Sequence, residues 1–248
     1  MKLSDFFKDN PKVALAFSGG VDSTYLLYAA KQYAEDITGY YVKSDFQPQF
    51  ELDDAKLIAE QLDVKLKILE LDLFVNPDVI KNGSDRCYYC KSMILSTIIN
   101  QAQIDGYSVL LDGTNASDDS NERPGMRALT ELKIKSPLRE CGLTKSDIRD
   151  LSAKAGLSTA NKPAYSCLAT RIPQGMNITK EKLQTTEKAE SFLFELGFND
   201  FRIKYLGDFA QIRLAANEFA LFFEQKEIIF TELKKYYPKI ILDPEPRI

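Results

Sequence analysis

The chain has 248 residues, with 36 acidic and 32 basic side chains and a net charge of −4. This length suffices for one large domain, or for a medium domain with a small one. The acidic balance argues against a nucleic-acid partner, because such proteins usually carry a basic excess. No apolar run reaches the ~18 residues that cross a bilayer, and the N-terminus has no signal-peptide core, so we expect a cytoplasmic protein with no membrane partner.

Histidine is absent and cysteine occurs four times. Without histidine, Ser–His and Cys–His nucleophiles and histidine-ligated metals are excluded. In a cytoplasmic protein, cysteines bind metals or take part in catalysis more often than they form disulfides. We therefore expect the chemistry to come from cysteines, carboxylates, cations, backbone amides or a cofactor.

Strand and helix patterns alternate through the first half of the chain. Four apolar runs are typical of buried strands: 13–17, 37–42, 65–71 and 108–112. Helical patterns lie between them, after Ser23, over 51–62 and over 92–102, the last preceded by a turn-rich stretch at 76–91. This alternation predicts an α/β fold, a Rossmann-like parallel sheet with helices on both faces. Ligands gather at the carboxyl ends of the strands in such sheets.

The pattern changes near Gly175. Before it, residues 116–125 form a polar loop, and Thr144 caps a helix that runs to Ala155. After it we expect a helix, two strands, a long helix and a last short strand, at 179–196, 201–205, 210–214, 217–236 and 239–242. The sequence thus predicts two domains, 1–175 and 176–248, the second a small α+β domain for substrate binding or oligomerisation.

A glycine-containing hexapeptide directly follows the first predicted strand: Ser18, Gly19, Gly20, Val21, Asp22 and Ser23. Free amides at a helix N-terminus favour an anion, and the glycines let a phosphate approach the backbone. The loop lacks the lysine of a G-x-x-x-x-G-K-[ST] motif, so γ-phosphoryl transfer is not indicated. It resembles the pyrophosphate loop (PP-loop) of N-type ATP pyrophosphatases, in which hydroxyls such as Ser18 and Ser23 would hold pyrophosphate and Asp22 would lie near Mg²⁺. The alternative is a plain strand-to-helix turn.

Two cysteines form a C-x-x-C pair, Cys87 and Cys90. The pair alone could be a redox dithiol, half of a zinc site or two semi-buried thiols. Together with Cys167, three thiolates would suit an iron–sulfur cluster with one open iron. Arg171, four residues beyond Cys167, would favour the thiolate form of that cysteine. Cys141, at the end of a predicted helix, is interpreted as structural.

The chain resembles the LarE family of ATP-dependent sulfur transferases across roughly residues 10–215. The matching pieces, in order, are 18–23, 86–91, 112–115, 123–125, 136–138 and 166–173. The resemblance implies that a carboxylate of pyridinium-3,5-dicarboxylate mononucleotide is adenylated by ATP, and that sulfur then replaces the activated oxygen. The thiocarboxylate product serves a nickel-pincer nucleotide cofactor.

The resemblance also implies site residues. Cys87, Cys90 and Cys167 would hold a [4Fe–4S] cluster supplied by a sulfide source, or Cys167 would sacrifice its own sulfur. The catalytic residues would be Cys167 and Asp22. Nucleotide-binding residues outside the loop would be Gly113, Thr114, Arg123, Arg171, Arg202 and Lys204. The implied cofactors are ATP, Mg²⁺ and the cluster, and we expect a homo-oligomer.

Arg213 stands where the family often has an acidic residue, so a metal site using that acid is not supported. Two other functions stay open. A tRNA thiolase of the same superfamily would need a basic groove or an added RNA-binding module. A regulatory ATP- or AMP-binding protein would carry the C-x-x-C pair as a zinc ligand.

Overall fold

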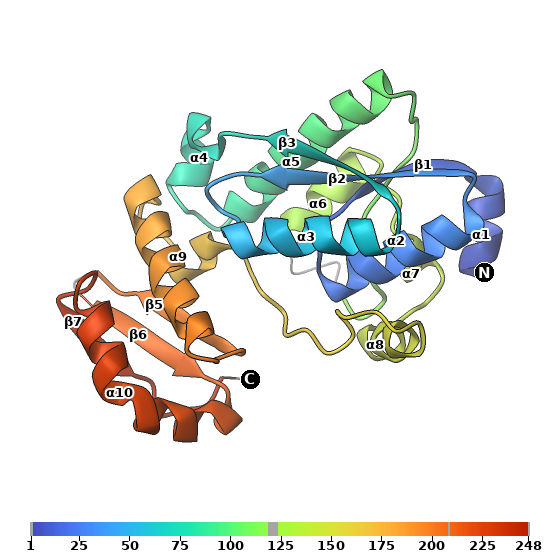
Figure 1. Cartoon of the computed structure of the whole chain (residues 1–248). Coiled ribbons are helices and arrows are strands. Elements are labelled where there is room, and N and C mark those ends of the chain that lie inside the picture. The colour runs from blue at the N-terminus through green and yellow to red at the C-terminus, as the bar shows by residue number, and fades with distance from the viewer. Residues whose placement is uncertain (1, 119–123, 208, 248) are drawn as a thin grey trace. The chain divides into compact units, whose positions relative to one another are not determined.

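The computed structural model describes residues 2–118, 124–207 and 209–247, and these form two compact units (Figure 1). Unit 1 comprises residues 1–79 and 84–165, and unit 2 comprises residues 80–83 and 166–248. The boundary predicted near Gly175 from the sequence stays a prediction. None of the helices in the described ranges has both the length and the apolar character needed to span a bilayer.

Unit 1 contains a four-stranded parallel sheet with the order β3-β2-β1-β4. The strands are β1 (Lys12–Ala16), β2 (Asp36–Lys43), β3 (Lys65–Glu70) and β4 (Leu110–Leu111). Leu15 of β1 lies between Gly39 of β2 and Leu111 of β4. The chain runs from β1 to β2 and β3 on one side, and then returns from β3 to β4 on the other side of β1. The ends of β1 and β4 therefore form the switch point where such sheets bind ligands.

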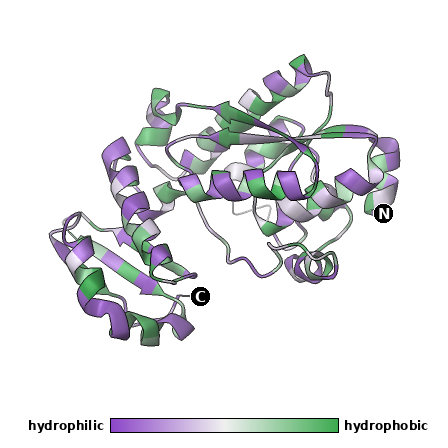
Figure 2. Ribbon diagram, viewed as in Figure 1, coloured by the Kyte–Doolittle hydropathy of each residue, from purple (hydrophilic) through white to green (hydrophobic). Residues whose placement is uncertain are grey.

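Helices cover both faces of this sheet, as the alternating pattern predicts. Up to residue 154 they are α1 (Leu3–Asp9), α2 (Val21–Tyr33), α3 (Gln49–Gln61), η1 (Leu73–Val75), α4 (Pro77–Ile80), α5 (Arg86–Ile104), α6 (Pro124–Glu131), α7 (Pro137–Glu140) and α8 (Lys145–Lys154). One core packs Leu15 against Leu26 and Ile58, and the other packs Ala14 against Leu95. Green and purple alternate along α3, which buries one side (Figure 2).

Helix α5 begins six residues earlier than the sequence suggests, at Arg86 instead of Ser92, so the C-x-x-C pair lies on its first turns. The prediction was wrong there because turn-forming residues precede the motif and local propensity favoured a loop. Tertiary contacts override that preference. The Tyr88 hydroxyl donates to Glu131 Oε2 at 2.6 Å, and the Arg127 guanidinium stacks 3.6 Å from the Tyr88 ring. Both partners belong to α6, which the sequence analysis did not predict.

Unit 2 is the small α+β domain that the sequence predicts. Its strands are β5 (Phe201–Tyr205), β6 (Phe209–Leu214) and β7 (Lys239–Leu242). Strands β5 and β6 are antiparallel, and β6 and β7 are parallel. Its helical segments are η2 (Leu168–Arg171), α9 (Lys180–Glu195), η3 (Ala216–Glu218) and α10 (Phe219–Leu233). Leu193, Phe198, Ile212 and Leu233 are fully buried in its core.

Candidate functional site

The loop that follows β1 is shaped to receive an anion. Gly19 adopts a φ of 72°, a left-handed conformation that favours glycine. Gly20 is the N-cap of α2, and no side chain in the described structure caps that helix. Its first N–H groups are therefore available to a ligand. The hydroxyls of Ser18 and Ser23 lie 3.1 Å apart, and Ser23 Oγ donates to Gly20 O at 3.1 Å, which holds the loop closed.

The end of β4 presses against the start of α2. A Cβ atom built on Gly113 would lie 3.0 Å from Ser23 N and 3.2 Å from Ser23 Cα. Only glycine fits this approach without moving backbone. The two segments predicted to bind nucleotide, 18–23 and 113–114, are thereby brought together at the carboxyl ends of β1 and β4.

A cavity lies at these carboxyl ends, and its volume of about 430 Å³ is within the usual range for small-molecule sites. Its polar lining includes Ser18, Ser23, Asp22, Gly113 and Thr114, and its apolar lining includes Tyr40, Val42, Ile94 and Leu95. Burial raises the pKa of Tyr40, and its hydrogen bond to Asp105 raises that pKa further. The cavity thus has polar groups suited to a phosphate on one side and an apolar surface suited to a planar base on the other.

Asp22 lines the cavity, and only one of its two carboxylate oxygens accepts a hydrogen bond. Its Oδ2 accepts from Lys145 Nζ at 2.6 Å. Its Oδ1 is buried and has no hydrogen-bond partner among the described residues. A hard carboxylate oxygen in that state is a good ligand for Mg²⁺, so the residues present fit the ion. Lys145 is the first residue of α8, whose Thr144 cap the structure confirms.

Asp112, the last residue before Gly113, collects donors from three segments. It accepts from Thr114 Oγ1 at 2.6 Å, from Ser136 Oγ at 2.6 Å and from Lys91 Nζ at 3.4 Å. Lys91 belongs to α5, directly after Cys90. Asp112 therefore links the cavity to the helix that carries the C-x-x-C pair.

The four cysteines form no disulfide in the described chain. Cys87 and Cys90 lie one turn apart on α5, and Arg86 donates to Cys87 Sγ at 3.3 Å. Cys167 is the residue before η2 in unit 2. Burial raises the pKa of the Cys141 thiol, which agrees with a structural role. Within the residues described, no group of three or more Cys, Asp or Glu side chains is gathered for a metal ion.

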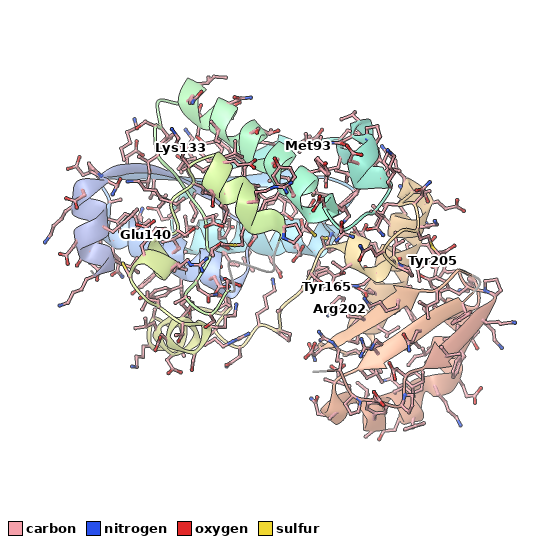
Figure 3. The ribbon with its side chains drawn as sticks, turned by 180° about the vertical axis from the view of Figure 1, so that it is seen from behind. Met93, Lys133, Glu140, Tyr165, Arg202 and Tyr205 are labelled. Carbon is pink, nitrogen blue, oxygen red and sulfur yellow. The ribbon has the colours of Figure 1, made fainter. Side chains whose placement is uncertain are left out.

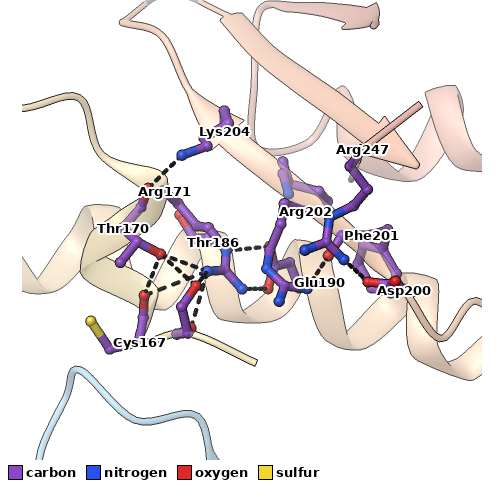
Figure 4. Close-up of polar contacts among 12 residues, drawn as sticks. Cys167, Thr170, Arg171, Thr186, Glu190, Asp200, Phe201, Arg202, Lys204 and Arg247 are labelled. Atoms are coloured by element: carbon purple, nitrogen blue, oxygen red, sulfur yellow. Dashed lines mark hydrogen bonds and ion pairs between the residues drawn. The ribbon is translucent and has the colours of Figure 1, made fainter. Parts of the chain in front are cut away.

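Arg171 lies in the interior of unit 2. Its side chain is 1% exposed and makes two hydrogen bonds to Glu190, from Nε at 2.8 Å and from Nη2 at 3.0 Å (Figure 4). Its Nη1 donates to Ser166 O at 3.0 Å and to Thr170 Oγ1 at 2.7 Å. In this arrangement Arg171 fixes the turn that carries Cys167. Its predicted role in nucleotide binding stays a prediction.

Arg202 and Lys204 lie on β5, where Figure 3 labels Arg202 and Tyr205. Lys204 Nζ donates to Thr170 O at 2.7 Å (Figure 4). Burial lowers the pKa of Lys204, and neighbouring arginines, Arg171 first, lower it further. The remaining predicted residue, Arg123, lies outside the described residues.

Residues 12–80 match a family model described as queuosine biosynthesis protein QueC. An uncharacterized protein of Synechocystis sp. is 35% identical over 224 residues, 89% of this chain and 82% of that protein. The pyridinium-3,5-bisthiocarboxylic acid mononucleotide synthase of Lactiplantibacillus plantarum is 34% identical over 210 residues, 84% of this chain and 76% of that protein. The chain belongs to the LarE family. It is a distant member of it, within the PP-loop ATP pyrophosphatases, as the sequence motifs predict.

Membership of the PP-loop ATP pyrophosphatases implies ATP and Mg²⁺ as cofactors. More remote similarity reaches tRNA-specific 2-thiouridylases of Clostridium botulinum, at 25% identity over 182 residues, 60% of this chain and 52% of those proteins. Two residues of this LarE-family chain bind carboxylates that line the cavity but were not predicted as site residues. Lys145 is 123 positions from Asp22, and Ser136 is 24 from Asp112. No local pattern marks such pairs, and only the predicted Thr144 cap placed Lys145 at a helix start.

Replacing Lys145 with methionine should reduce pyrophosphate release about 10- to 100-fold. The change removes a cation beside the loop and the charge-assisted bond that holds Asp22, each a contribution of ~1.5–3 kcal/mol. Pyrophosphate release at saturating ATP and thermal unfolding measure the two consequences. Lys154→Met is the matched control, because Lys154 lies exposed at the other end of α8. Equal rates for the two variants would show that Lys145 has no part in the reaction.

Proposed function

We propose that the chain is an ATP-dependent sulfur transferase acting on a carboxylate of pyridinium-3,5-dicarboxylate mononucleotide. In the first step a carboxylate oxygen attacks the α-phosphorus of ATP, the bond to the bridging oxygen breaks and pyrophosphate leaves. In the second step a sulfur nucleophile attacks the acyl carbon, and AMP leaves with the original oxygen. The product is a thiocarboxylate, the group required by a nickel-pincer nucleotide cofactor.

The observation that carries the proposal is the arrangement of loop 18–23 against Gly113 at the mouth of the cavity. The uncapped start of α2 and the two serine hydroxyls offer donors to a departing pyrophosphate. Asp22 Oδ1 would hold Mg²⁺, which would neutralise the charge that develops on the leaving group. Lys145 and Lys91 add cations from α8 and α5. The apolar wall beside Tyr40 and Ile94 would receive the adenine.

Cys87, Cys90 and Cys167 would hold a [4Fe–4S] cluster. The donor set fits such a group, because the three are thiols and two of them lie one helical turn apart. When bound, the cluster would carry an extra sulfide at its open iron and supply the sulfur. In the sacrificial alternative Cys167 Sγ attacks the acyl carbon and AMP leaves. Loss of the Cys167 Cα proton then breaks its Cβ–Sγ bond, leaving dehydroalanine and the thiocarboxylate.

Unit 2 would bind the mononucleotide through cations on β5. Arg202 is largely buried and its Nη1 donates to Phe201 O, and the rest of its guanidinium would bind phosphate. Lys204 would act as a point charge. In unit 1, Gly113 and Thr114 line the cavity and would contact ATP. Arg171 holds the Cys167 turn through Ser166 and Thr170 and so acts by positioning.

Iron and labile sulfide measured on anaerobically purified protein test the cluster. We expect about 4 Fe per chain, as in a [4Fe–4S] centre. The iron should be lost in Cys87→Ala, Cys90→Ala and Cys167→Ala and retained in the matched control Cys141→Ser. Stoichiometric zinc without sulfide would contradict the cluster. Mass spectrometry after turnover would reveal sacrificial chemistry as a loss of ~34 Da, one H₂S, from Cys167.

The tRNA thiolase is the second candidate, because part of the chain is similar to tRNA-specific 2-thiouridylases. The net charge of −4 disfavours it, since tRNA binding draws on a basic surface. Pyrophosphate release with pyridinium carboxylate mononucleotides, together with the absence of a gel shift by bulk tRNA, supports the sulfur transferase. A tRNA shift with tRNA-dependent pyrophosphate release would replace the proposal.

A further inference from the structure

One face of the sheet in unit 2 carries a set of cations. Phe201 and Ile203 of β5 point into the core and are buried. Because side chains alternate along a strand, Arg202 and Lys204 lie on the opposite face. The antiparallel register pairs Arg202 with Arg213 of β6, and Lys204 with Gln211. Two arginines are therefore direct cross-strand neighbours on this face.

Such a pair is unfavourable by itself, because like charges directly opposite each other destabilise a sheet. Among the described residues, the charged groups that act on Lys204 are three arginines and one carboxylate: Arg171, Arg202 and Arg213 against Glu190. The lowered pKa of Lys204, caused by burial and by its neighbouring arginines, reflects the same excess of positive charge. A bound dianion would relieve this repulsion.

Arg213 is the member of the set whose hydrogen-bonding capacity is left unused. Its side chain is 38% exposed, and its Nε lies 3.1 Å from Asp243 Oδ2 without the geometry of a hydrogen bond. Among the described residues its two terminal nitrogens have no hydrogen-bond partner. Asp243 Oδ2 also accepts from Gln211 Nε2 at 3.1 Å, and Asp243 N donates to Ile212 O at 2.9 Å. Asp243 thus forms an ion pair on the Nε side of Arg213, and the outer edge of the guanidinium is available.

We propose that Arg213 is the third cation, beside Arg202 and Lys204, of a site for the phosphate monoester of the mononucleotide, and that Asp243 positions it. The proposal rests on the proposed function for the identity of the substrate. A guanidinium edge donates two parallel bonds to a phosphate, which an ammonium group cannot do. Three cations favour the dianion of a monoester over a phosphodiester or an uncharged riboside.

The test uses the full chain and nicotinic acid mononucleotide, a pyridinium carboxylate with a phosphate monoester, in calorimetric titrations in phosphate-free buffer. We expect Arg213→Gln to weaken its binding about tenfold or more, and Arg213→Lys to restore part of the affinity. Asp243→Asn should weaken binding less than Arg213→Gln does. Lys239→Gln is the matched control, because Lys239 pairs with Phe209, at the far end of β6 from Arg213. Nicotinic acid riboside, which lacks the phosphate, should bind weakly and equally to all variants.

Unchanged affinity of Arg213→Gln for the mononucleotide would overturn the proposal, and so would failure of the wild-type chain to bind it. Equal losses of affinity in Arg213→Gln and Lys239→Gln would show that the effect comes from the net charge of the unit. That result would also overturn the proposal. Circular dichroism establishes that each variant is folded. The proposed function fails separately, if the mononucleotide binds through Arg213 but no pyridinium carboxylate supports pyrophosphate release from ATP.

Discussion

Gly113→Ala is expected to reduce pyrophosphate release about 10- to 100-fold, because backbone must move by a few tenths of an ångström and a displacement of about 1 Å in a reacting group can cost ~100-fold. The added methyl group would meet backbone atoms of Ser23 at 3.0 and 3.2 Å. Backbone cannot move aside as a flexible side chain can, so the start of α2 and the loop 18–23 must shift. The cost in stability should be smaller, ~1–3 kcal/mol, as for other overpacked sites. Pyrophosphate release and thermal unfolding measure the two effects.

Gly83→Ala is the control for this substitution. No atom lies within 4 Å of a Cβ built on Gly83, and its φ does not require glycine. Wild-type release is therefore expected for this variant. Normal release by Gly113→Ala would show that pyrophosphate release does not depend on the close packing of the segment after β4 against α2. That result would remove the main structural support for the proposed site.

The strands and the PP-loop could be predicted because their signals are local. A buried parallel strand is a continuous apolar run, and 13–17 and 37–42 show it plainly. A loop that must expose amides to a phosphate needs small residues directly after the strand, as at Gly19 and Gly20. The parallel pairing of the strands could also be predicted, because strands that alternate with helices are joined by crossover connections.

Contacts between distant segments could not be predicted in the same way. The first turns of α5 are helical because Tyr88 packs on α6, and no feature of 86–91 alone records that partner. The bond between Lys145 and Asp22 depends on how α8 docks against α2. Arg171 shows the same limit: its position four residues after Cys167 does not reveal that Glu190 is its buried partner.

Glu190→Gln should destabilise unit 2 by ~3–5 kcal/mol, the usual cost of breaking a buried ion pair by removing one charge. Both partners are 1% exposed, so water cannot replace the lost interaction. Glu190 Oε1 also accepts from Ile203 N at 2.8 Å, which ties α9 to the edge of β5. Urea unfolding of the full chain, followed by the tyrosine signal, measures the loss. The pair of Lys235 and Glu232, which are 61% and 23% exposed, supplies the control, since Glu232→Gln should cost no more than ~1 kcal/mol.

The same substitution should make the Cys167 thiol react faster with an alkylating reagent. Arg171 holds the carbonyl of Ser166 and the hydroxyl of Thr170 only while Glu190 orients its guanidinium. Labelling of Cys167 under native conditions, followed by peptide mass spectrometry, reports the loosened turn independently of global unfolding. Arg171→Met should reproduce both effects, and the double variant should lose less than the sum of the two, because both changes break one interaction. Additive losses with unchanged labelling would mean that the pair contributes to packing alone and leaves the placement of Cys167 to other contacts.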